Sequence, residues 1–314
     1  MEKLGLYTSG REDSFKEVDP RGVKAKISFD MPRGRQAEDW FDIVAKRQSE
    51  RDETEDNYNY AKIELESDKQ GIIGFTGDWH LGSRIDYEML MRDVSIIAEH
   101  PDVAGCFLMG DLTDSANFNP AQDENYLSYE EQRQMMINIM DYIGKDKILA
   151  MWKGNHDHKW ERKNGTSKYA GLSERYEAPV FYGNAYIDLL VNGINYKLMG
   201  SHRQRGNSIY SNAHPAVRGH RETQGLDLSF CGHTHQKGLT EQAVKEFNGS
   251  RMTYSLVSGT YQLGGEYAKD SGFGTQQGDQ LGMYWAVFGN KSKVVKILTT
   301  EQMLELMKDM MRND

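Results

Sequence analysis

Residues 71–80 read GIIGFTGDWH, an apolar run that is followed at once by Asp78-Trp79-His80. The run has the length and composition of a buried strand. In an extended segment, residues i and i+2 point to the same side, so Asp78 and His80 are expected to reach one metal ion. The segment therefore predicts a strand that presents two polar side chains where it ends.

The same arrangement recurs four times further along the chain. VAGCFLM precedes Gly110-Asp111, KILAMWK precedes Gly154-Asn155-His156-Asp157, YKLMGS precedes His202, and LDLSFC precedes Gly232-His233-Thr234-His235. Ligands of open α/β sheets bind where strands end, so these motifs are predicted to meet at one rim. The glycines that open most of the motifs permit tight turns and a close backbone approach there.

Together the motifs offer three oxygen-bearing and four imidazole side chains suited to two metal ions, and one further histidine. Mixed imidazole and oxygen donors favour Mn, Fe, Zn, Co or Ni over Mg or Ca. Asp111 is a single carboxylate able to bridge two ions, and Asn155 supplies a neutral amide oxygen. Two ions about 3.5–4 Å apart can deprotonate a water molecule and hold a phosphate for in-line attack. The chain is therefore predicted to be a two-metal hydrolase.

The alternation of apolar runs with amphipathic segments between residues 71 and 153 indicates an α/β core. A helix is predicted over 86–99 with Asp86 as its N-cap, and another over 125–143 with Gly144 after its end.

After about residue 178 the pattern changes to successive strands. The predicted strands are PVFY, AYIDLLV, INYKLMG, LDLSFC, MTYSLVS, MYWAVF and KVVKILT, followed by a short helix over 301–311. Residues 259–282 form a loop rich in Gly, Gln, Tyr and Asp, and a loop of this length is usually functional or disordered.

The first 70 residues differ from the rest because they are rich in charge and interrupted by prolines and glycines. A helix is predicted over 36–58, with a short apolar stripe at its start. We therefore predict an N-terminal arm over 1–70 with a charged helix, and a catalytic domain over 71–314. The arm either packs on the main domain or contacts a partner chain or substrate.

The chain has 314 residues and a net charge of -9, which argues against a protein that coats nucleic acid over its whole surface. A local basic groove remains compatible with this charge. Cys106 and Cys231 lie in apolar runs and are expected to be buried free thiols of a reducing compartment. No apolar segment has the roughly 20 residues of a membrane span, and the N-terminus has no signal-like region. The expected location is the cytoplasm, with no membrane partner.

In their order, the blocks Asp-x-His, Gly-Asp-x-x-Asp, Gly-Asn-His-Asp, a lone His and Gly-His-x-His resemble the calcineurin-like metallophosphoesterase superfamily. The first block, residues 77–82, is similar to the opening block of the Mre11/SbcD-type nuclease branch. The resemblance covers about residues 70–300 and leaves out the N-terminal arm. It implies a four-layer αββα sandwich, in which two facing sheets are flanked by helices.

The resemblance also implies a role for each motif residue. His156 would face the scissile phosphate and protonate or stabilise the leaving oxygen, and Asp114 would orient His156 by accepting a proton from its other ring nitrogen. The lone histidine is taken as His202, because it ends a strand-like run whereas His214 and His220 do not. One ion would be held by Asp78, His80, Asp111 and His235, and the other by Asp111, Asn155, His202 and His233.

Two departures from the family narrow the expected activity. Ser115 follows Asp114 where the phosphoprotein phosphatase branch has an arginine, which counts against a Ser/Thr protein phosphatase. Only about 60 residues follow Ser250, so the C-terminal DNA-capping region of the Mre11/SbcD branch is expected to be reduced or absent.

Basic residues flank two of the motifs. Lys159 lies beside the Gly-Asn-His motif, and Arg203 and Arg205 follow His202 in a stretch, 199–221, that holds no acidic residue. These three are the candidate substrate-binding residues. A basic rim on an acidic protein favours a polyanion such as nucleic acid, and an ordinary solvated basic surface is the alternative. Four loop aromatics are candidates for stacking on bases: Tyr210, Tyr261, Tyr267 and Phe273.

The sequence thus predicts a binuclear phosphodiesterase, a nuclease acting on DNA or another nucleic acid, with Mn as the expected metal. Metal-bound hydroxide would attack phosphorus while His156 assists the leaving oxygen. The alternatives are a phosphomonoesterase or a small (cyclic) nucleotide phosphodiesterase. A non-catalytic scaffold fits less well, because such proteins usually lose ligands and this chain retains the full set.

Overall fold

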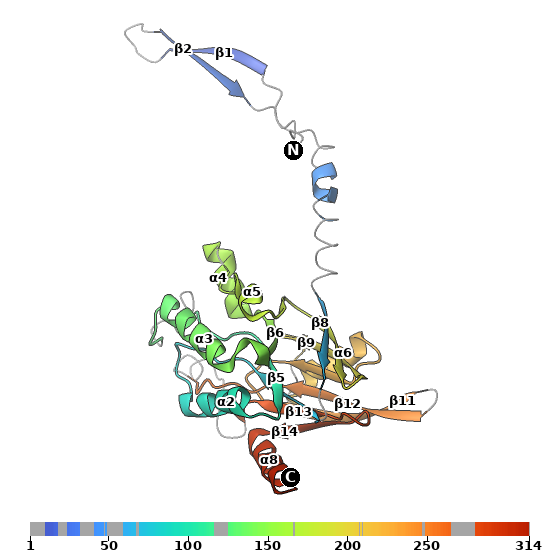
Figure 1. Cartoon of the computed structure of the whole chain (residues 1–314). Coiled ribbons are helices and arrows are strands. Elements are labelled where there is room, and N and C mark those ends of the chain that lie inside the picture. The colour runs from blue at the N-terminus through green and yellow to red at the C-terminus, as the bar shows by residue number, and fades with distance from the viewer. Residues whose placement is uncertain are drawn as a thin grey trace. The chain divides into compact units, whose positions relative to one another are not determined.

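The computed structural model describes residues 10–17, 24–31, 41–46, 48, 59–66, 69–115, 125–165, 167–206, 208, 210–246, 249–264 and 280–313. Contacts divide the chain into two compact units, an N-terminal unit of Met1–Asn57 and a main unit of Tyr58–Asp314 (Figure 1). Within the described ranges, no helix is long and apolar enough to cross a membrane.

The described part of the N-terminal unit contains a strand pair and a short helical stretch. Strand β1 (Gly10–Glu17) pairs antiparallel with β2 (Lys24–Met31). Residues 41–46 and 48 are helical and fall inside the range predicted as a helix. The rest of that predicted helix lies outside the described residues.

The first sheet of the main unit has the strand order β14-β13-β4-β5-β6-β7. Its parallel strands are β4 (Gly71–Thr76), β5 (Val103–Leu108), β6 (Ile148–Trp152) and β7 (Val180–Phe181). The antiparallel strands beside β4 are β13 (Tyr284–Phe288) and β14 (Val295–Thr299). All six coincide with runs that the sequence predicted as strands. Because β4, β5 and β6 are parallel, the motifs that follow them leave the sheet at the same edge.

The second sheet has the strand order β11-β12-β10-β9-β8-β3. Its strands are β3 (Tyr60–Leu65), β8 (Ala185–Val191), β9 (Ile194–Ser201), β10 (Leu228–Cys231), β11 (Gly238–Glu246) and β12 (Gly249–Val257). β10 lies between β9 and β12 and is parallel to both, so the motifs after β9 and β10 also share one edge.

Strand β3 moves the start of the main unit toward the N-terminus. It was assigned to the arm over 1–70, but it pairs in parallel with β8 and forms an edge of the second sheet. Its charged residues Lys62 and Glu64 alternate with half-buried Ala61 and Ile63, as expected for an edge strand with one face in solvent. The arm therefore ends before β3, not at residue 70.

Helices cover the outer faces of the sheets and join their strands. They are α2 (Tyr87–Glu99), α3 (Tyr129–Ile143), α4 (Asn155–Asn164), α5 (Leu172–Tyr176), α6 (His214–Glu222), α8 (Thr300–Asn313) and the 3₁₀ turn η2 (Lys145–Lys147). α2 begins as predicted, with the Asp86 carboxylate accepting a hydrogen bond from the Met89 amide at 2.9 Å. α3 begins later than predicted, at a capping box of Ser128 and Glu131, and Gly144 ends it.

Apolar clusters define the layers of the main unit. β4 is buried on both faces, with Ile72 in the cluster that α2, α3 and α8 cover and Ile73 in the cluster between the two sheets. On the outer face of the second sheet, Ala216 of α6 packs with Cys231 and Val257. The helix–sheet–sheet–helix order confirms the predicted αββα sandwich (Figure 1).

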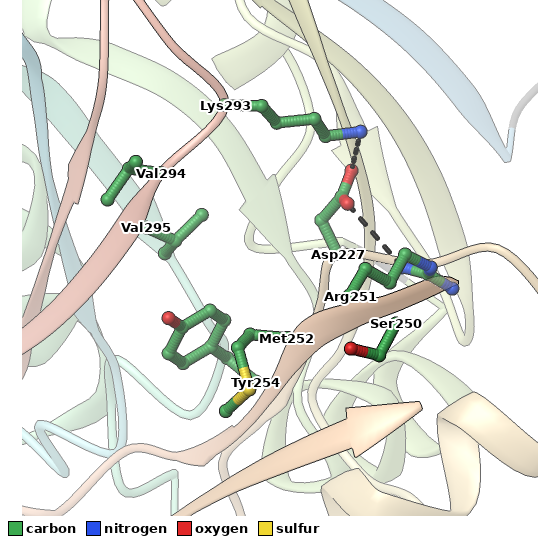
Figure 2. A pocket seen from close by; sticks show the side chains of 8 residues that line it. All are labelled: Asp227, Ser250, Arg251, Met252, Tyr254, Lys293, Val294 and Val295. Atoms are coloured by element: carbon green, nitrogen blue, oxygen red, sulfur yellow. Dashed lines mark hydrogen bonds and ion pairs between the residues drawn. The ribbon is translucent and has the colours of Figure 1, made fainter. Parts of the chain in front are cut away.

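Asp227 joins the two sheets at the edge opposite the motif loops. Its carboxylate accepts a hydrogen bond from the Lys197 amide at 2.8 Å and pairs with Lys293 Nζ at 2.8 Å and Arg251 Nη1 at 3.5 Å. Lys293 lies in the turn between β13 and β14, whereas the other partners belong to the second sheet. These side chains line one wall of a cavity of about 430 Å³ whose apolar wall includes Val294 (Figure 2).

We expect Asp227→Asn to lower the free energy of unfolding by about 1–3 kcal/mol, because it removes the charge that the two cations share. Urea denaturation monitored by circular dichroism measures this change. Glu305→Gln, at an exposed position of α8, serves as the control and should change stability by less than about 0.5 kcal/mol. Equal stability of the two variants would show that Asp227 does not tie the sheets together.

Candidate metal centre

The motif loops after β4, β5, β9 and β10 are joined by hydrogen bonds between their backbones and side chains. Within the first sheet, the Asp78 amide donates to the Gly110 carbonyl at 2.9 Å. Between the sheets, the His233 amide donates to Asp78 Oδ2 at 2.8 Å, and His202 Nδ1 donates to the Met109 carbonyl at 2.8 Å. These contacts bring the ends of both sheets to a common rim.

The backbone at this rim is held in an uncommon conformation. Of the eight non-glycine residues with positive φ within the described ranges, six lie in the motifs or directly after Asp114. They are Asp78, His80, Asp111, Ser115, His233 and His235. Positive φ in a non-glycine residue stores strain and is typical of functional sites. The extended geometry predicted for Asp78 and His80 is therefore wrong, and left-handed turns bring these two side chains together instead.

The first half-site consists of Asp78, His80 and His235, whose ligand atoms converge. The two histidine Nε2 atoms lie 3.0 Å apart, and Asp78 Oδ1 lies 3.4 Å from His235 Nε2 and 3.8 Å from His80 Nε2. Asp78 Oδ1 is buried and has no hydrogen-bond partner within the described ranges. An orphaned carboxylate oxygen facing two imidazole nitrogens fits a divalent cation.

The second half-site consists of Asp111, Asn155, His202 and His233. The Asn155 side-chain oxygen lies 3.0 Å from His202 Nε2, 3.3 Å from Asp111 Oδ2 and 2.6 Å from His233 Nδ1. One carboxylate, one amide and two imidazoles thus converge, and such mixed oxygen and imidazole donors fit a second divalent ion.

Hydrogen bonds to the outer ring nitrogens set which nitrogen each histidine presents to the ions. His80 Nδ1 lies 2.9 Å from Asp114 Oδ1, and His202 Nδ1 donates to a backbone carbonyl. Both Nε2 atoms therefore face the centre, as in other metal sites where an outer partner sets the tautomer.

The contact between Asp114 and His156 differs in its atoms from the prediction. His156 Nδ1 donates to the backbone carbonyl of Asp114 at 2.5 Å, while the Asp114 carboxylate lies 3.9 Å from the same nitrogen. The carboxylate is already engaged with His80, and Asn125 Nδ2 donates to its other oxygen at 3.1 Å. Asp114 therefore contacts the outer ring nitrogen of His156 through its main-chain carbonyl, and its carboxylate serves His80 and Asn125.

The third motif forms the first turn of α4. The His156 amide donates to Asp111 Oδ1 at 2.9 Å, which leaves Asp111 Oδ2 for the second half-site. Asp157 Oδ2 accepts from the amides of Gly154 at 2.7 Å and Asp111 at 3.3 Å, so Asp157 supports the turn. A Cβ atom on Gly154 would lie 1.9 Å from Asp111 Oδ1, so this close approach requires glycine.

The candidate substrate-binding and base-stacking residues differ in how far their side chains are exposed. Lys159, Arg203 and Arg205 are exposed, as substrate-binding residues must be. Tyr261 is fully buried and its hydroxyl donates to Asp93 Oδ2 at 2.9 Å, so its prediction as a stacking residue is wrong. Tyr210 is 91% exposed and can still stack. The candidates Tyr267 and Phe273 lie outside the described residues.

Several polar residues that support the site were not predicted. They are the buried Thr113, Gln132 and Lys168 and the half-buried Asn125. Each is an isolated polar residue without motif spacing, and a lone lysine in a polar stretch usually lies in solvent. The pattern of the sequence therefore held no signal for them.

The pKa values of three ring-bearing ligand candidates show which of these histidines is protonated when no ion is bound. Burial lowers the pKa of His80, but hydrogen bonds with Asp114 and Asp78 outweigh it and raise this pKa to about 10. Burial likewise opposes the charge and hydrogen bond of Asp111, which raise the pKa of His202 to about 9. Burial and the charge of His202 instead lower the pKa of His233 to about 4.

A profile of the family described as "Calcineurin-like phosphoesterase" matches residues 72–237, which contain the metal-binding motifs from Asp78 to His235. The search among curated proteins found no match.

Solved structures with a similar chain include a metallophosphoesterase from Sphaerobacter thermophilus, with 12% identity, 77% of this chain and 93% of that chain covered, and a TM-score of 0.35. The nuclease MPE of Pseudomonas putida has 13% identity, coverage of 72% and 87%, and a TM-score of 0.32. Vps29 of Chaetomium thermophilum has 9% identity, coverage of 73% and 95%, and a TM-score of 0.32.

We expect metal binding at pH 7.5 to release about one proton each from His80 and His202, because both rings are protonated below their raised pKa values and a ligand nitrogen must be neutral. Metal affinity should consequently rise with pH, by about tenfold per proton and pH unit. Calorimetric titration with Mn²⁺ in two buffers of different protonation enthalpy measures the protons released. Identical heats in both buffers would refute the protonated state.

Gly154→Ala should lose both ions, because the added methyl group displaces the Asp111 carboxylate, which is predicted to contact both ions. Elemental analysis of the purified protein gives the metal content. Gly193→Ala in the turn between β8 and β9 is the control, since its Cβ would meet no atom within 4 Å and any cost is one of backbone conformation alone. A Gly154→Ala protein that retained two ions would contradict the close approach.

Proposed function

Because the chain belongs to the calcineurin-like phosphoesterase family, we propose that it is a two-metal phosphodiesterase that hydrolyses DNA or another nucleic acid. The observation that carries this proposal is the pair of adjoining half-sites, in which seven motif residues face one rim. Mn is the proposed metal because the donors are mixed imidazole and oxygen.

The half-sites define the chemistry available at the rim. When bound, two divalent ions would activate a water molecule and neutralise charge on the phosphate oxygens. Asp78, His80 and His235 would hold one ion, Asn155, His202 and His233 the other, and Asp111 would lie between them.

His156 is the residue placed to act on the leaving group. Its Nδ1 hydrogen bond to the Asp114 carbonyl fixes the ring, and its side chain is 21% exposed, so the Nε2 edge can meet substrate. Burial lowers the pKa of His156, although the charge of Asp111 opposes this. A phosphate anion beside the ring favours the protonated form. We propose that the ring gains its second proton as substrate binds and passes it from Nε2 to the departing oxygen.

The proposal of a polymeric substrate rests on charge. Arg203 lies close enough to the second half-site for its charge to help lower the pKa of His233. Arg205 and Lys159 are exposed in the segments that follow β9 and β6. Lys153, by contrast, is paired with Glu161 at 3.0 Å and contributes less to the rim. Three exposed cations in segments that carry or follow the proposed ligands suit a substrate with several phosphates in a row.

The proposal also includes a branch of the family and a cellular location. Membership of the Mre11/SbcD-type nuclease branch rests on the block over residues 77–82. Action in the cytoplasm rests on Cys106 and Cys231, which are buried free thiols as predicted.

We expect metal-stripped protein to cleave end-labelled single- or double-stranded DNA only when Mn²⁺ is restored. His156→Ala should lose about 10²–10⁴-fold in turnover yet bind two ions, because it removes a proton donor and no ligand. His158→Ala is the matched control, since His158 lies on the same helix and its ring contacts Tyr182 instead of the half-sites.

Other outcomes separate the rival activities. A protein that leaves DNA intact but hydrolyses a chromogenic phosphate monoester or a small cyclic nucleotide would retain the metal chemistry and refute the proposed substrate. Full DNA cleavage by His156→Ala would refute the role of that histidine. Failure to hydrolyse any phosphate ester with two ions bound would point to a non-catalytic role.

A further inference from the structure

Lys168 carries a fully buried ammonium group close to the second half-site. Its Nζ donates to Asp157 Oδ1 at 3.1 Å and to Thr113 Oγ1 at 2.5 Å, and it lies 5.6 Å from the centre of the Tyr129 ring. Lysine is rarely fully buried, and a buried charge is tolerated only where it is paired and hydrogen-bonded. The position of this lysine therefore depends on the contacts that it makes.

The first contact leads to the backbone of the second half-site. Asp157 uses one carboxylate oxygen for Lys168 and the other for the amides of Gly154 and Asp111. Gly154 directly precedes the ligand Asn155, and Asp111 is itself a ligand. A single carboxylate thus sets the position of two ligands, and Lys168 sets the position of that carboxylate.

The second contact leads to the loop after β5. Thr113 Oγ1, which accepts from Lys168, also lies 2.9 Å from Ser115 Oγ, and the Ser115 amide donates to the buried Gln132 side chain at 2.9 Å. Lys168 therefore joins two motif loops that come from neighbouring strands. Both loops contribute ligands to the second half-site.

The first half-site is held by other contacts. Asp78 Oδ2 accepts from the His233 amide, and His80 Nδ1 contacts the Asp114 carboxylate. The His80 amide also donates to the Asp111 carbonyl at 3.0 Å. Lys168 takes part in none of these contacts, so the two half-sites differ in their dependence on it.

We propose that Lys168 is a positioning residue for the second metal ion. Through Asp157 it holds Asn155, which would bind only that ion, and Asp111, which both ions would share, so its loss weakens the second ion more than the first. The inference rests on the two-metal site of the proposed function and not on the substrate. A lysine that merely fills space would lower stability and leave the ratio of the two affinities unchanged.

The test uses Mn²⁺ alone and compares Lys168→Met with the wild-type protein. Electron paramagnetic resonance measures free Mn²⁺ during titration and gives a dissociation constant for each ion, and Asn155→Ala identifies which ion belongs to the second half-site. In Lys168→Met we expect the second dissociation constant to rise about 10–100-fold and the first to change less than about threefold. Lys168→Arg should recover part of the loss because it keeps the charge and the donors.

Lys147→Met is the matched control. Lys147 is a half-buried lysine at the opposite end of β6, where its Nζ donates to the carbonyls of His100 and Val103. Its substitution removes comparable contacts at a distance from the motif loops. Both dissociation constants should stay at their wild-type values in this variant.

Equal effects on both ions, or none, in a folded Lys168→Met protein would overturn the proposal. If that variant does not fold, Thr113→Val removes one of the two acceptors and should weaken the second ion alone; unchanged affinities in Thr113→Val would overturn the proposal as well. Wild-type protein that binds two ions but cleaves no DNA would refute the substrate proposed above and leave this inference standing.

Discussion

The fold and the site share two buried carboxylates, each of which divides its oxygens between backbone and metal centre. Asp78 gives one oxygen to the amide of His233, and Asp111 gives one to the amide of His156. The first of these bonds crosses from one sheet to the other, and the second fixes the start of α4. Two unpaired carboxylates in this interior would be unfavourable, so the arrangement requires cations or protons opposite their remaining oxygens. The charge that the centre attracts is thus set by groups that also hold the sandwich together.

The same constraint explains the strained backbone of the rim. Ligands placed on left-handed turns cost about 1–3 kcal/mol per residue, and such turns persist only where surrounding contacts over-determine them. Here the turns lie directly after strands that are buried on both faces, and their amides are paired with neighbouring loops. Gly154 marks the tightest point, since any side chain there would strike the Asp111 carboxylate. The rigid strands therefore hold the short turns in place, and the turns bring the candidate ligands close together.

The strands could be predicted from the sequence, whereas the conformation of the turns could not. An uninterrupted apolar run such as β4 reveals its strand and the rim that follows it, so the order of motifs located the side chains that the structure brings together in both half-sites. The turns themselves were misjudged, because φ is not visible in residue spacing. Long-range polar contacts were also invisible: Tyr261 became buried through a bond to Asp93, 168 residues away, and Lys168 through bonds to Asp157 and Thr113. Edge strand β3 was missed although its charged residues alternate with half-buried ones, because the whole charge-rich segment up to residue 70 was assigned to the arm.

Helix α4 was not predicted from the sequence, although it contains three residues of the Gly-Asn-His-Asp motif. Its sequence, NHDHKWERKN, is polar almost throughout, and Trp160 is the buried apolar residue that anchors it by stacking on Tyr129 with ring centroids 3.6 Å apart. Within one turn it nevertheless carries the proposed ligand Asn155, the proposed proton donor His156, and Asp157, which supports the turn. A helix with so little apolar surface cannot be placed by burial alone. Polar contacts at its N-terminus therefore add to this stacking, and Lys168 supplies the buried charge that those contacts need. The second half-site is therefore the part of the centre whose geometry a single distant substitution can change.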